Sequence, residues 1–202
     1  MTVVEDIVVK QLGRAEYSPT LEAMRAFTGA RTASTPDELW VLEHPPVYTL
    51  GQGARRPQLA NAIPVVQTDR GGEITYHGPG QAVLYTLVDL SRRGLKVREF
   101  VRLLEQAVID LVGSRAERKE GAPGVYVAGA KIAALGIRVA RGRAYHGVAL
   151  NVDMDLSPFH AIDPCGYPGL AVTQLRELGA RDSAAEAGGR LAAILAERLE
   201  RA

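Results

Sequence analysis

Two residues of this chain, Cys165 and Lys131, are of types that could carry out acyl transfer. Cys165 is the only cysteine, and it lies between Pro164 and Gly166 with no apolar periodicity around it. A free cysteine is usually a small core residue, but this setting predicts a loop position instead. A thiolate is a nucleophile, and a nearby ammonium group lowers the pKa of the thiol. Lowering that pKa from about 8.5 to about 7 requires roughly 2 kcal/mol, which one close cation can supply.

Lys131 is one of only four lysines, the others being Lys10, Lys96 and Lys119. It lies among small and apolar residues. That setting leaves two interpretations open. Lys131 is either an exposed lysine at a strand edge, which discourages strand pairing, or a partly buried amine whose pKa is lowered by loss of solvent. More than thirty residues separate Lys131 from Cys165, so spacing alone is a weak reason to pair them.

A glycine-rich run over residues 70–81 lies near the middle of the chain. Its four glycines and one proline predict neither a regular helix nor a regular strand. The run also contains Arg70, Tyr76 and His77, which a plain surface turn does not need. It is therefore either the rim or floor of a pocket or a long hairpin loop with incidental polar residues.

Strands and helices alternate around these residues. Strands are predicted over residues 3–9, 39–42, 47–50, 63–68, 83–88, 125–127, 137–139 and 146–152. Helices are predicted from Ser18-Pro19 to about residue 29, over residues 96–113, from Thr173 to Gly179, and from the capping box Ser183–Glu186 onward. Residues 83–88 are almost continuously apolar, as expected of a strand buried on both faces. The glycine-rich run thus lies between two strands, at a sheet end, where pockets commonly form.

Length and composition predict one domain over residues 1–202. A hydrophobic content of 47% and a charged content of 23% are ordinary for a globular protein. The net charge of +1 offers no electrostatic reason to expect nucleic acid or a membrane surface as a partner. No signal peptide is recognisable, and no apolar stretch approaches the roughly 18 residues that span a bilayer. A single cysteine cannot form an intramolecular disulfide. We therefore expect a cytoplasmic protein.

Five motifs resemble those of the lipoate-biosynthesis octanoyltransferases and occur in that family's order. They are Glu43-His44-Pro45-Pro46-Val47-Tyr48-Thr49-Leu50-Gly51, the run from Arg70 to Gln81, Gly129 to Ala133 with Gly136 and Arg138, His146-Gly147 with Ala149 and Asn151, and Pro164-Cys165-Gly166. The resemblance implies an α+β fold like that of the biotin and lipoate protein ligases. Such a fold has a mixed central sheet with packed helices and a smaller second sheet.

The resemblance also implies an activity, that of an octanoyl-[acyl-carrier-protein]:protein N-octanoyltransferase in lipoate biosynthesis. Cys165 would take the octanoyl group from acyl carrier protein as a thioester, and Lys131 would be the acid/base partner. The acceptors would be lysines of lipoyl domains in 2-oxo acid dehydrogenases and in the glycine cleavage H protein. No cofactor and no metal are implied.

The resemblance implies that three segments of this sequence contact the substrate. They are Arg70, Gly71, Gly72, Glu73, Ile74, Thr75, Tyr76 and His77; Ala134, Leu135 and Gly136; and Gly147, Val148 and Ala149. His77 and His160 are candidates for supporting polar roles. His44, beside two prolines, is more often a structural turn residue than a ligand or base.

Two rival functions stay open at this point. An ATP-dependent lipoate or biotin protein ligase would share the fold but needs a nucleotide phosphate loop, of which Arg141-Gly142-Arg143 is only a fragment. The other rival is a silent module that only binds acyl carrier or lipoyl domains. The loss of the nucleophile would mark such a module, and Cys165 is present.

Overall fold

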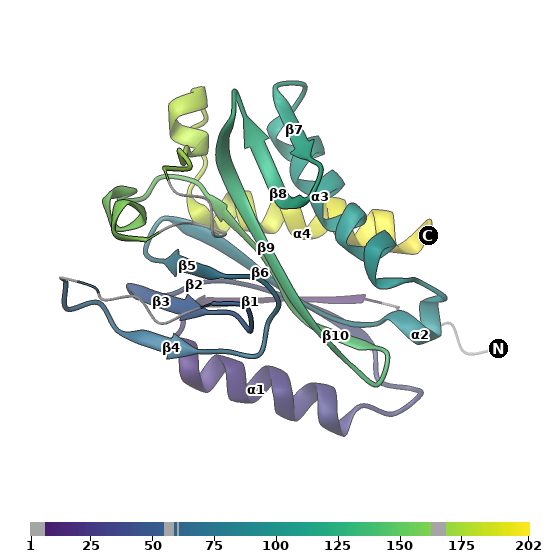
Figure 1. Ribbon diagram of the computed structural model, residues 1–202. Helices are drawn as coiled ribbons and strands as arrows, with labels where there is room; N and C mark the ends of the chain where they lie inside the picture. Colours follow the sequence, from purple (N-terminus) through teal and green to yellow (C-terminus); the bar gives the residue numbers. More distant parts are fainter. Residues whose placement is uncertain (1–6, 55–58, 60, 163–168) are drawn as a thin grey trace.

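The computed structural model describes residues 7–54, 59, 61–162 and 169–202 (Figure 1). A seven-stranded sheet forms the centre, in the order β1-β2-β6-β10-β9-β8-β7. Its strands are β1 (Ile7–Arg14), β2 (Asp37–Glu43), β6 (Gln81–Asp89), β7 (Ala116–Lys119), β8 (Ala122–Val127), β9 (Ala130–Ala140) and β10 (Arg143–Asn151). β1 is parallel to β2, and the other neighbours are antiparallel. The prediction of a mixed central sheet is confirmed.

A second sheet of three strands, β4 (Val65–Gln67), β3 (Val47–Leu50) and β5 (Ile74–His77), lies beside the first. β3 pairs parallel with β4 and antiparallel with β5. The smaller sheet that the resemblance implied is therefore present. β5 also corrects the prediction for the glycine-rich run, whose middle is a regular strand. Ile74 to His77 are residues that suit strands, and the glycines stand only on either side of them.

Helices cover both faces of the central sheet (Figure 1). Helix α1 (Tyr17–Ala30) packs on one face, and α3 (Val97–Val112) and α4 (Ala184–Glu200) pack together on the other. Short helical turns are α2 (Leu90–Arg93), η1 (Ser157–Ala161) and η3 (Leu175–Leu178). No helix among the described residues is both long and apolar enough to cross a bilayer.

Alternation along the central strands produces two cores. In β2, Leu39 and Val41 join the core under α3 and α4, whereas Trp40 and Leu42 join the core under α1. All nine residues of β6 are buried, which confirms the prediction of a strand covered on both faces.

The helix predictions hold except at two starts, that of α1 and that of the helix predicted from Thr173, which is the short turn η3 with Gln174 as its N-cap. The N-cap of α1 is Glu16 and not Ser18, so Pro19 lies at the third helical position. Proline is tolerated there because the backbone N–H groups of the first turn have no partner within the helix. The capping box of α4 is confirmed, with Ser183 N donating to Glu186 Oε2 at 2.8 Å.

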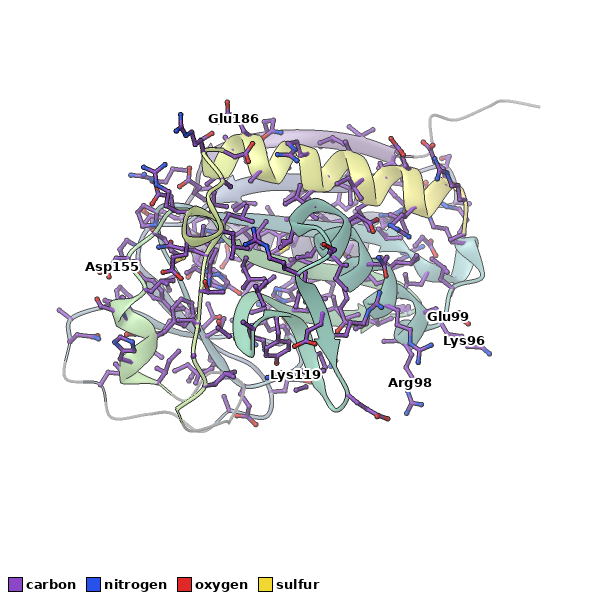
Figure 2. All side chains as sticks on the ribbon, turned by 90° about the horizontal axis from the view of Figure 1, so that it is seen from above. Lys96, Arg98, Glu99, Lys119, Asp155 and Glu186 are labelled. Carbon is purple, nitrogen blue, oxygen red and sulfur yellow. The ribbon has the colours of Figure 1, made fainter. Side chains whose placement is uncertain are left out.

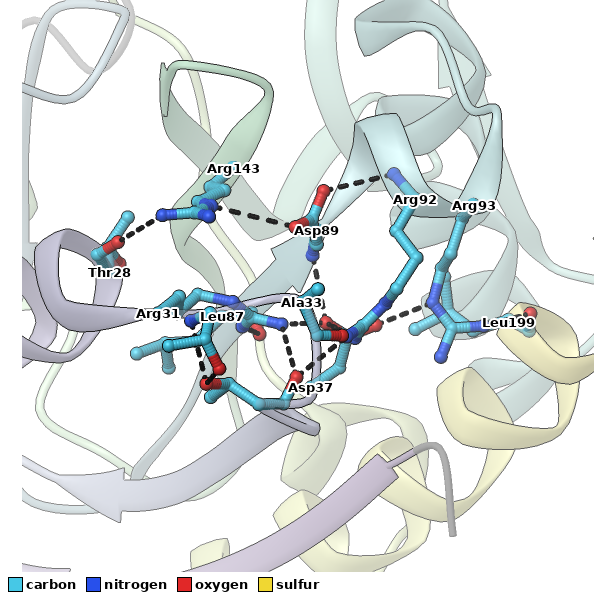
Figure 3. A network of polar contacts seen from close by, with 12 residues as sticks. Thr28, Arg31, Ala33, Asp37, Leu87, Asp89, Arg92, Arg93, Arg143 and Leu199 are labelled. Carbon is cyan, nitrogen blue, oxygen red and sulfur yellow. Dashed lines mark hydrogen bonds and ion pairs between the residues drawn. The ribbon is translucent and has the colours of Figure 1, made fainter. Parts of the chain in front are cut away.

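A buried ionic network closes one end of the central sheet (Figure 3). The Asp37 carboxylate, at the start of β2, is inaccessible to solvent and pairs with three arginines. Arg31 follows α1, whereas Arg92 and Arg93 belong to α2 and lie 2.8 and 2.6 Å from Asp37. Arg93 also donates to the Leu199 carbonyl oxygen at 2.8 Å. The network therefore ties β2 to α2 and to the end of α4.

Candidate active site

A cavity lies where β6, β9 and β10 of the central sheet meet β5 and the start of α1. Its volume is about 50 Å³, measured as the room available to the centres of water-sized spheres. Its lining comprises Tyr17, Arg70, Gly72, Glu73, Ile74, Thr75, His77, Val83, Tyr85, Ala134, Leu135, Gly136, His146, Gly147, Val148 and Ala149. Three segments separated by many residues in sequence thus converge on one cavity.

Most residues predicted to contact substrate line this cavity, with Gly71 and Tyr76 as the exceptions. Gly71 lines an adjoining hollow that shares Leu135 and Gly136 with the cavity. The Tyr76 ring packs against Tyr48 in a separate cluster, with ring centroids 5.4 Å apart. The contact of these segments with an acyl chain stays a prediction.

Two paired glycines in the cavity lining allow close packing of neighbouring atoms. Gly136 of β9 faces Gly147 of β10 across the sheet. A Cβ atom at Gly136 would lie 3.0 Å from Arg70 Cδ, and one at Gly147 would lie 2.1 Å from the Leu84 carbonyl oxygen. Larger residues at either position would displace Arg70 or the backbone of β6.

Lys131 lies in β9 and is only 3% exposed, so the interpretation as a solvent-exposed edge lysine is wrong. Its Nζ donates to the Pro123 carbonyl oxygen at 3.0 Å and lies 5.3 Å from the centre of the Tyr126 ring. Gly124 borders the stem, because a Cβ atom there would lie 2.4 Å from Lys131 Cε. The buried amine therefore occupies a site shaped around it.

Cys165, the predicted nucleophile, lies outside the described residues, and its role stays a prediction. Within the ranges that the structure does describe, no group of three or more His, Cys, Asp or Glu side chains is placed to hold a metal ion.

An Asp69–His146 pair is the main feature that sequence reasoning missed. Asp69 Oδ1 lies 2.8 Å from His146 Nε2, and Asp69 Oδ2 accepts from the Tyr145 hydroxyl at 2.6 Å and from Arg25 Nε at 3.0 Å. Burial opposes the charge of the carboxylate. Hydrogen bonds from His146, Tyr145 and Arg25 outweigh burial and lower the pKa of Asp69 to about 2. The one signal for this pair in the sequence was that Asp69, a charged residue, directly precedes the glycine-rich run that begins at Arg70.

A second polar chain runs from the start of α1 into the cavity. His44 Nδ1 lies 2.6 Å from the Ala15 carbonyl oxygen, and His44 Nε2 lies 2.7 Å from the Tyr85 hydroxyl. Burial lowers the pKa of His44 to about 4, so the ring is neutral at pH 7. Its neutral Nε2 accepts from Tyr85 if Nδ1 donates to Ala15. His44 thus holds Tyr85 in place, which is the structural role that its sequence context favoured.

The other two candidate histidines differ sharply in environment. His77 lines the cavity, with Nδ1 2.7 Å from Gln81 Oε1 and Nε2 3.3 Å from Thr49 Oγ1. Burial, with a smaller effect of His44, lowers the pKa of His77 to about 3, so it too is neutral. His160 is exposed on η1 and does not line the cavity.

Comparison with known families identifies the class of protein to which this fold and cavity belong. The family model of the lipoyl protein ligase A/B catalytic domain matches residues 16–193, and the chain belongs to that family. Within it, the chain is an acyltransferase of the octanoyltransferase group, because similar curated proteins carry that name. One from Aromatoleum aromaticum is 60% identical over 94% of this chain and 84% of its own length. One from Thiobacillus denitrificans is 66% identical over 86% of this chain and 82% of its own length.

Solved structures share the fold at low sequence identity. A lipoate protein ligase from Thermoplasma acidophilum has a TM-score of 0.72 at 16% identity, covering 96% of this chain and 84% of the other. A biotin protein ligase from Aquifex aeolicus has a TM-score of 0.56 at 14% identity, covering 96% and 69%. The fold predicted from the resemblance is therefore confirmed.

Proposed function

We propose that this chain transfers an octanoyl group from octanoyl-acyl carrier protein to lysines of lipoyl domains, through a thioester on Cys165. Lys131 is the acid/base residue, and residues 1–202 act as one catalytic domain. The observation that carries the proposal is that residues 134–136, residues 147–149 and all of residues 70–77 but Gly71 and Tyr76 line one cavity in a member of the octanoyltransferase group.

The reaction proceeds in two balanced steps. The Cys165 thiolate attacks the donor thioester carbonyl, the bond to the pantetheine sulfur breaks, and that sulfur leaves as a thiol. The acceptor lysine amine then attacks the Cys165 thioester, an amide forms, and the cysteine leaves as a thiolate. The first step exchanges one thioester for another and the second is downhill, so no nucleotide is needed. A thiolate nucleophile also suits the reducing cytoplasm.

Lys131 suits the proton transfers of this scheme. As an ammonium, it stabilises the Cys165 thiolate and donates a proton to the departing pantetheine sulfur. As a free amine, it accepts the proton that the attacking lysine loses. Its burial and its hydrogen bond to the Pro123 carbonyl oxygen fix its position. Backbone N–H groups of the glycine-rich segments are candidates for stabilising the tetrahedral oxyanion.

The cavity wall suits an alkyl chain. Ile74, Val83, Leu135 and Val148 supply apolar surface to its lining. Each buried methylene group contributes about 0.8 kcal/mol. An eight-carbon chain therefore gains enough from burial to be held without a charged anchor.

A basic groove next to the cavity supports acyl carrier protein as the donor. The groove between α3 and the β7–β8 hairpin is lined by Arg98, Arg102, Arg118 and Lys119, against the acidic Glu105 and Glu120. Arg98 projects from the start of α3 into solvent (Figure 2). The groove shares Val101, Gly121 and Pro123 with the hollow beside the cavity, and we propose that an acyl-bearing arm enters from this side. Acyl carrier proteins are generally acidic, and we propose that they dock here.

Lipoyl domains are proposed as acceptors because a lipoate protein ligase of this fold, from Thermoplasma acidophilum, was studied together with its E2 lipoyl domain. Lipoyl domains of 2-oxo acid dehydrogenases and of the glycine cleavage H protein present the lysine amine that the second step requires.

Mass spectrometry of the intact protein tests the mechanism. After mixing with octanoyl-acyl carrier protein, we expect one octanoyl adduct on Cys165 that hydroxylamine removes and that a lipoyl domain discharges. Cys165→Ser should lack the thioester, and Lys131→Ala should fold but lose most transfer. An active enzyme whose Cys165 is never acylated would refute the mechanism. Pyrophosphate release from ATP with free octanoate would instead favour the ligase alternative.

A further inference from the structure

A buried glutamate, Glu105 of α3, reaches across to the strands on which α3 packs. It is only 6% exposed, and its Oε1 accepts a hydrogen bond from Gly124 N of β8 at 3.1 Å. Its Oε2 lies 3.2 Å from Arg118 Nε of β7. A glutamate is almost never fully buried unless it is paired, so these two contacts account for its burial. The contact with Gly124 leads directly to Lys131.

The backbone of β8 is irregular where Glu105 meets it. The β7–β8 register passes over residues 123 and 124, and the β8–β9 register begins at Val125. Gly124 has φ of +143°, a conformation that residues with a side chain rarely adopt. The peptide group between Pro123 and Gly124 therefore bonds to side chains and not to a neighbouring strand.

This one peptide group joins Glu105 to Lys131. Its carbonyl oxygen, which belongs to Pro123, accepts a hydrogen bond from Lys131 Nζ at 3.0 Å. Its N–H, which belongs to Gly124, donates to Glu105. A peptide group is planar, and its N–H and C=O point in opposite directions, so fixing the N–H also fixes the direction of the C=O. Glu105 thus sets where the oxygen that holds the Lys131 amine points.

We propose that Glu105 is a positioning residue for Lys131 and acts through the Pro123–Gly124 peptide. Its oxygen keeps that peptide in the orientation in which the carbonyl oxygen holds the amine for proton transfer. Because no strand partner constrains the peptide, loss of the Glu105 acceptor lets it turn, and Lys131 Nζ moves with it. The ion pair with Arg118 uses the other carboxylate oxygen, and the positioning role does not depend on it. This role rests on the proposed function of Lys131.

Two substitutions of equal side-chain length separate the acceptor oxygen from the charge. Glu105→Met and Glu105→Gln both lose the charge and the ion pair with Arg118, but only Gln keeps an oxygen that can accept from Gly124 N. The measured quantity is the rate constant with which saturating lipoyl domain discharges the octanoyl thioester of each variant in a single turnover. We expect Glu105→Met to lower it about tenfold and Glu105→Gln to recover most of that loss. The lipoyl-domain concentration at half-saturation should not change, because binding does not involve Lys131.

Glu105→Asp supplies an independent comparison if Glu105→Met does not fold. Aspartate keeps the charge but is one methylene group shorter, so we expect it to discharge more slowly than Glu105→Gln. Asp110→Asn is the matched control, because Asp110 also lies on α3 and pairs with an arginine, Arg198, but makes no contact with β8 in the described structure. Its rate constant should equal that of the wild type.

Three outcomes overturn the positioning role of Glu105. They are a normal rate in Glu105→Met, a rate in Glu105→Gln as low as that in Glu105→Met, and a faster discharge by Glu105→Asp than by Glu105→Gln. The last two would assign the effect to the charge of the carboxylate. Absence of an octanoyl thioester in the wild type, or normal discharge by Lys131→Ala, refutes the proposed function instead. Slow discharge by Lys131→Ala with normal discharge by Glu105→Met refutes only the role of Glu105.

Discussion

Lys131 is joined to Val172 by a parallel β-bridge. Lys131 N donates to the Ala171 carbonyl oxygen at 2.8 Å, and Thr173 N donates to the Lys131 carbonyl oxygen at 3.0 Å. The backbone of the proposed acid/base residue is therefore held by residues 171–173, a segment distant from it in sequence. Its side chain is held separately, by the Pro123 carbonyl oxygen and by the space that Gly124 leaves.

Gly124→Ala should impair transfer by displacing Lys131. The new Cβ would lie 2.4 Å from Lys131 Cε and 2.9 Å from the Ala133 carbonyl oxygen. Since a small misplacement of a catalytic group can cost about 100-fold, we expect kcat to fall at least tenfold. Gly121→Ala is the matched control, because Gly121 also has positive φ but a Cβ there meets nothing within 4 Å. Normal turnover by Gly124→Ala, or an equal loss in the control, would contradict this prediction.

Asp37→Asn should destabilise the fold without altering the chemistry. The substitution leaves Arg31, whose side chain is 1% exposed, without its buried counter-charge. Breaking a buried ion pair in this way costs about 3–5 kcal/mol. Urea denaturation measures the change in the free energy of unfolding. The control is Asp182→Asn, which removes a partly exposed pair with Arg190 and should cost at most about 1 kcal/mol. Equal effects of the two substitutions would show that the Asp37 network does not stabilise the protein.

Acid should unfold the protein through three buried histidines. The pKa values of His44 and His146 are lowered to about 4 and that of His77 to about 3, by burial in each case. An unfolded histidine has a pKa of about 6.5, so below that pH the unfolded chain binds more protons than the folded chain. The free energy of unfolding is therefore expected to fall as the pH drops from about 6.5 towards 4, by several kcal/mol in total.

Urea denaturation between about pH 7 and 4.5 measures this dependence. His160→Ala, which removes an exposed histidine of η1, should leave the curve unchanged. A free energy of unfolding that stays constant between pH 7 and 5 would contradict the buried, neutral state of these rings.

Charge reversal in the basic groove should weaken only the protein donor. For Arg98→Glu combined with Arg102→Glu, we expect the KM for octanoyl-acyl carrier protein to rise about tenfold. The KM for a small octanoyl-pantetheine thioester should not change, because that substrate needs no docking surface. Arg201→Glu, at the far end of α4 and 79% exposed, is the control. Added salt should raise the wild-type KM for the protein donor in the same direction. Unchanged use of the protein donor by the double variant would place docking elsewhere.

The helices and most strands could be predicted from sequence because their signals are local. The apolar stripe of α3, the capping box of α4 and the apolar run of β6 all confirm this. The start of α1 was misplaced because proline is compatible with several positions in a first turn. β5 was missed because the glycines on both sides of it favoured a loop prediction, although the four residues between them suit a strand.

Sequence by itself determined which segments matter: the motifs carried Lys131, Cys165 and the residues that line the cavity, because motif chemistry depends on residue type and local spacing. Only the tertiary structure decided how those segments meet. Asp69 and His146 are 77 residues apart, and their contact depends on strand pairing and on one left-handed residue. The burial of Lys131 likewise depends on β8, Gly124 and the bridge to Val172. Periodicity specifies which face a side chain occupies, whereas its partner on that face is set by long-range packing.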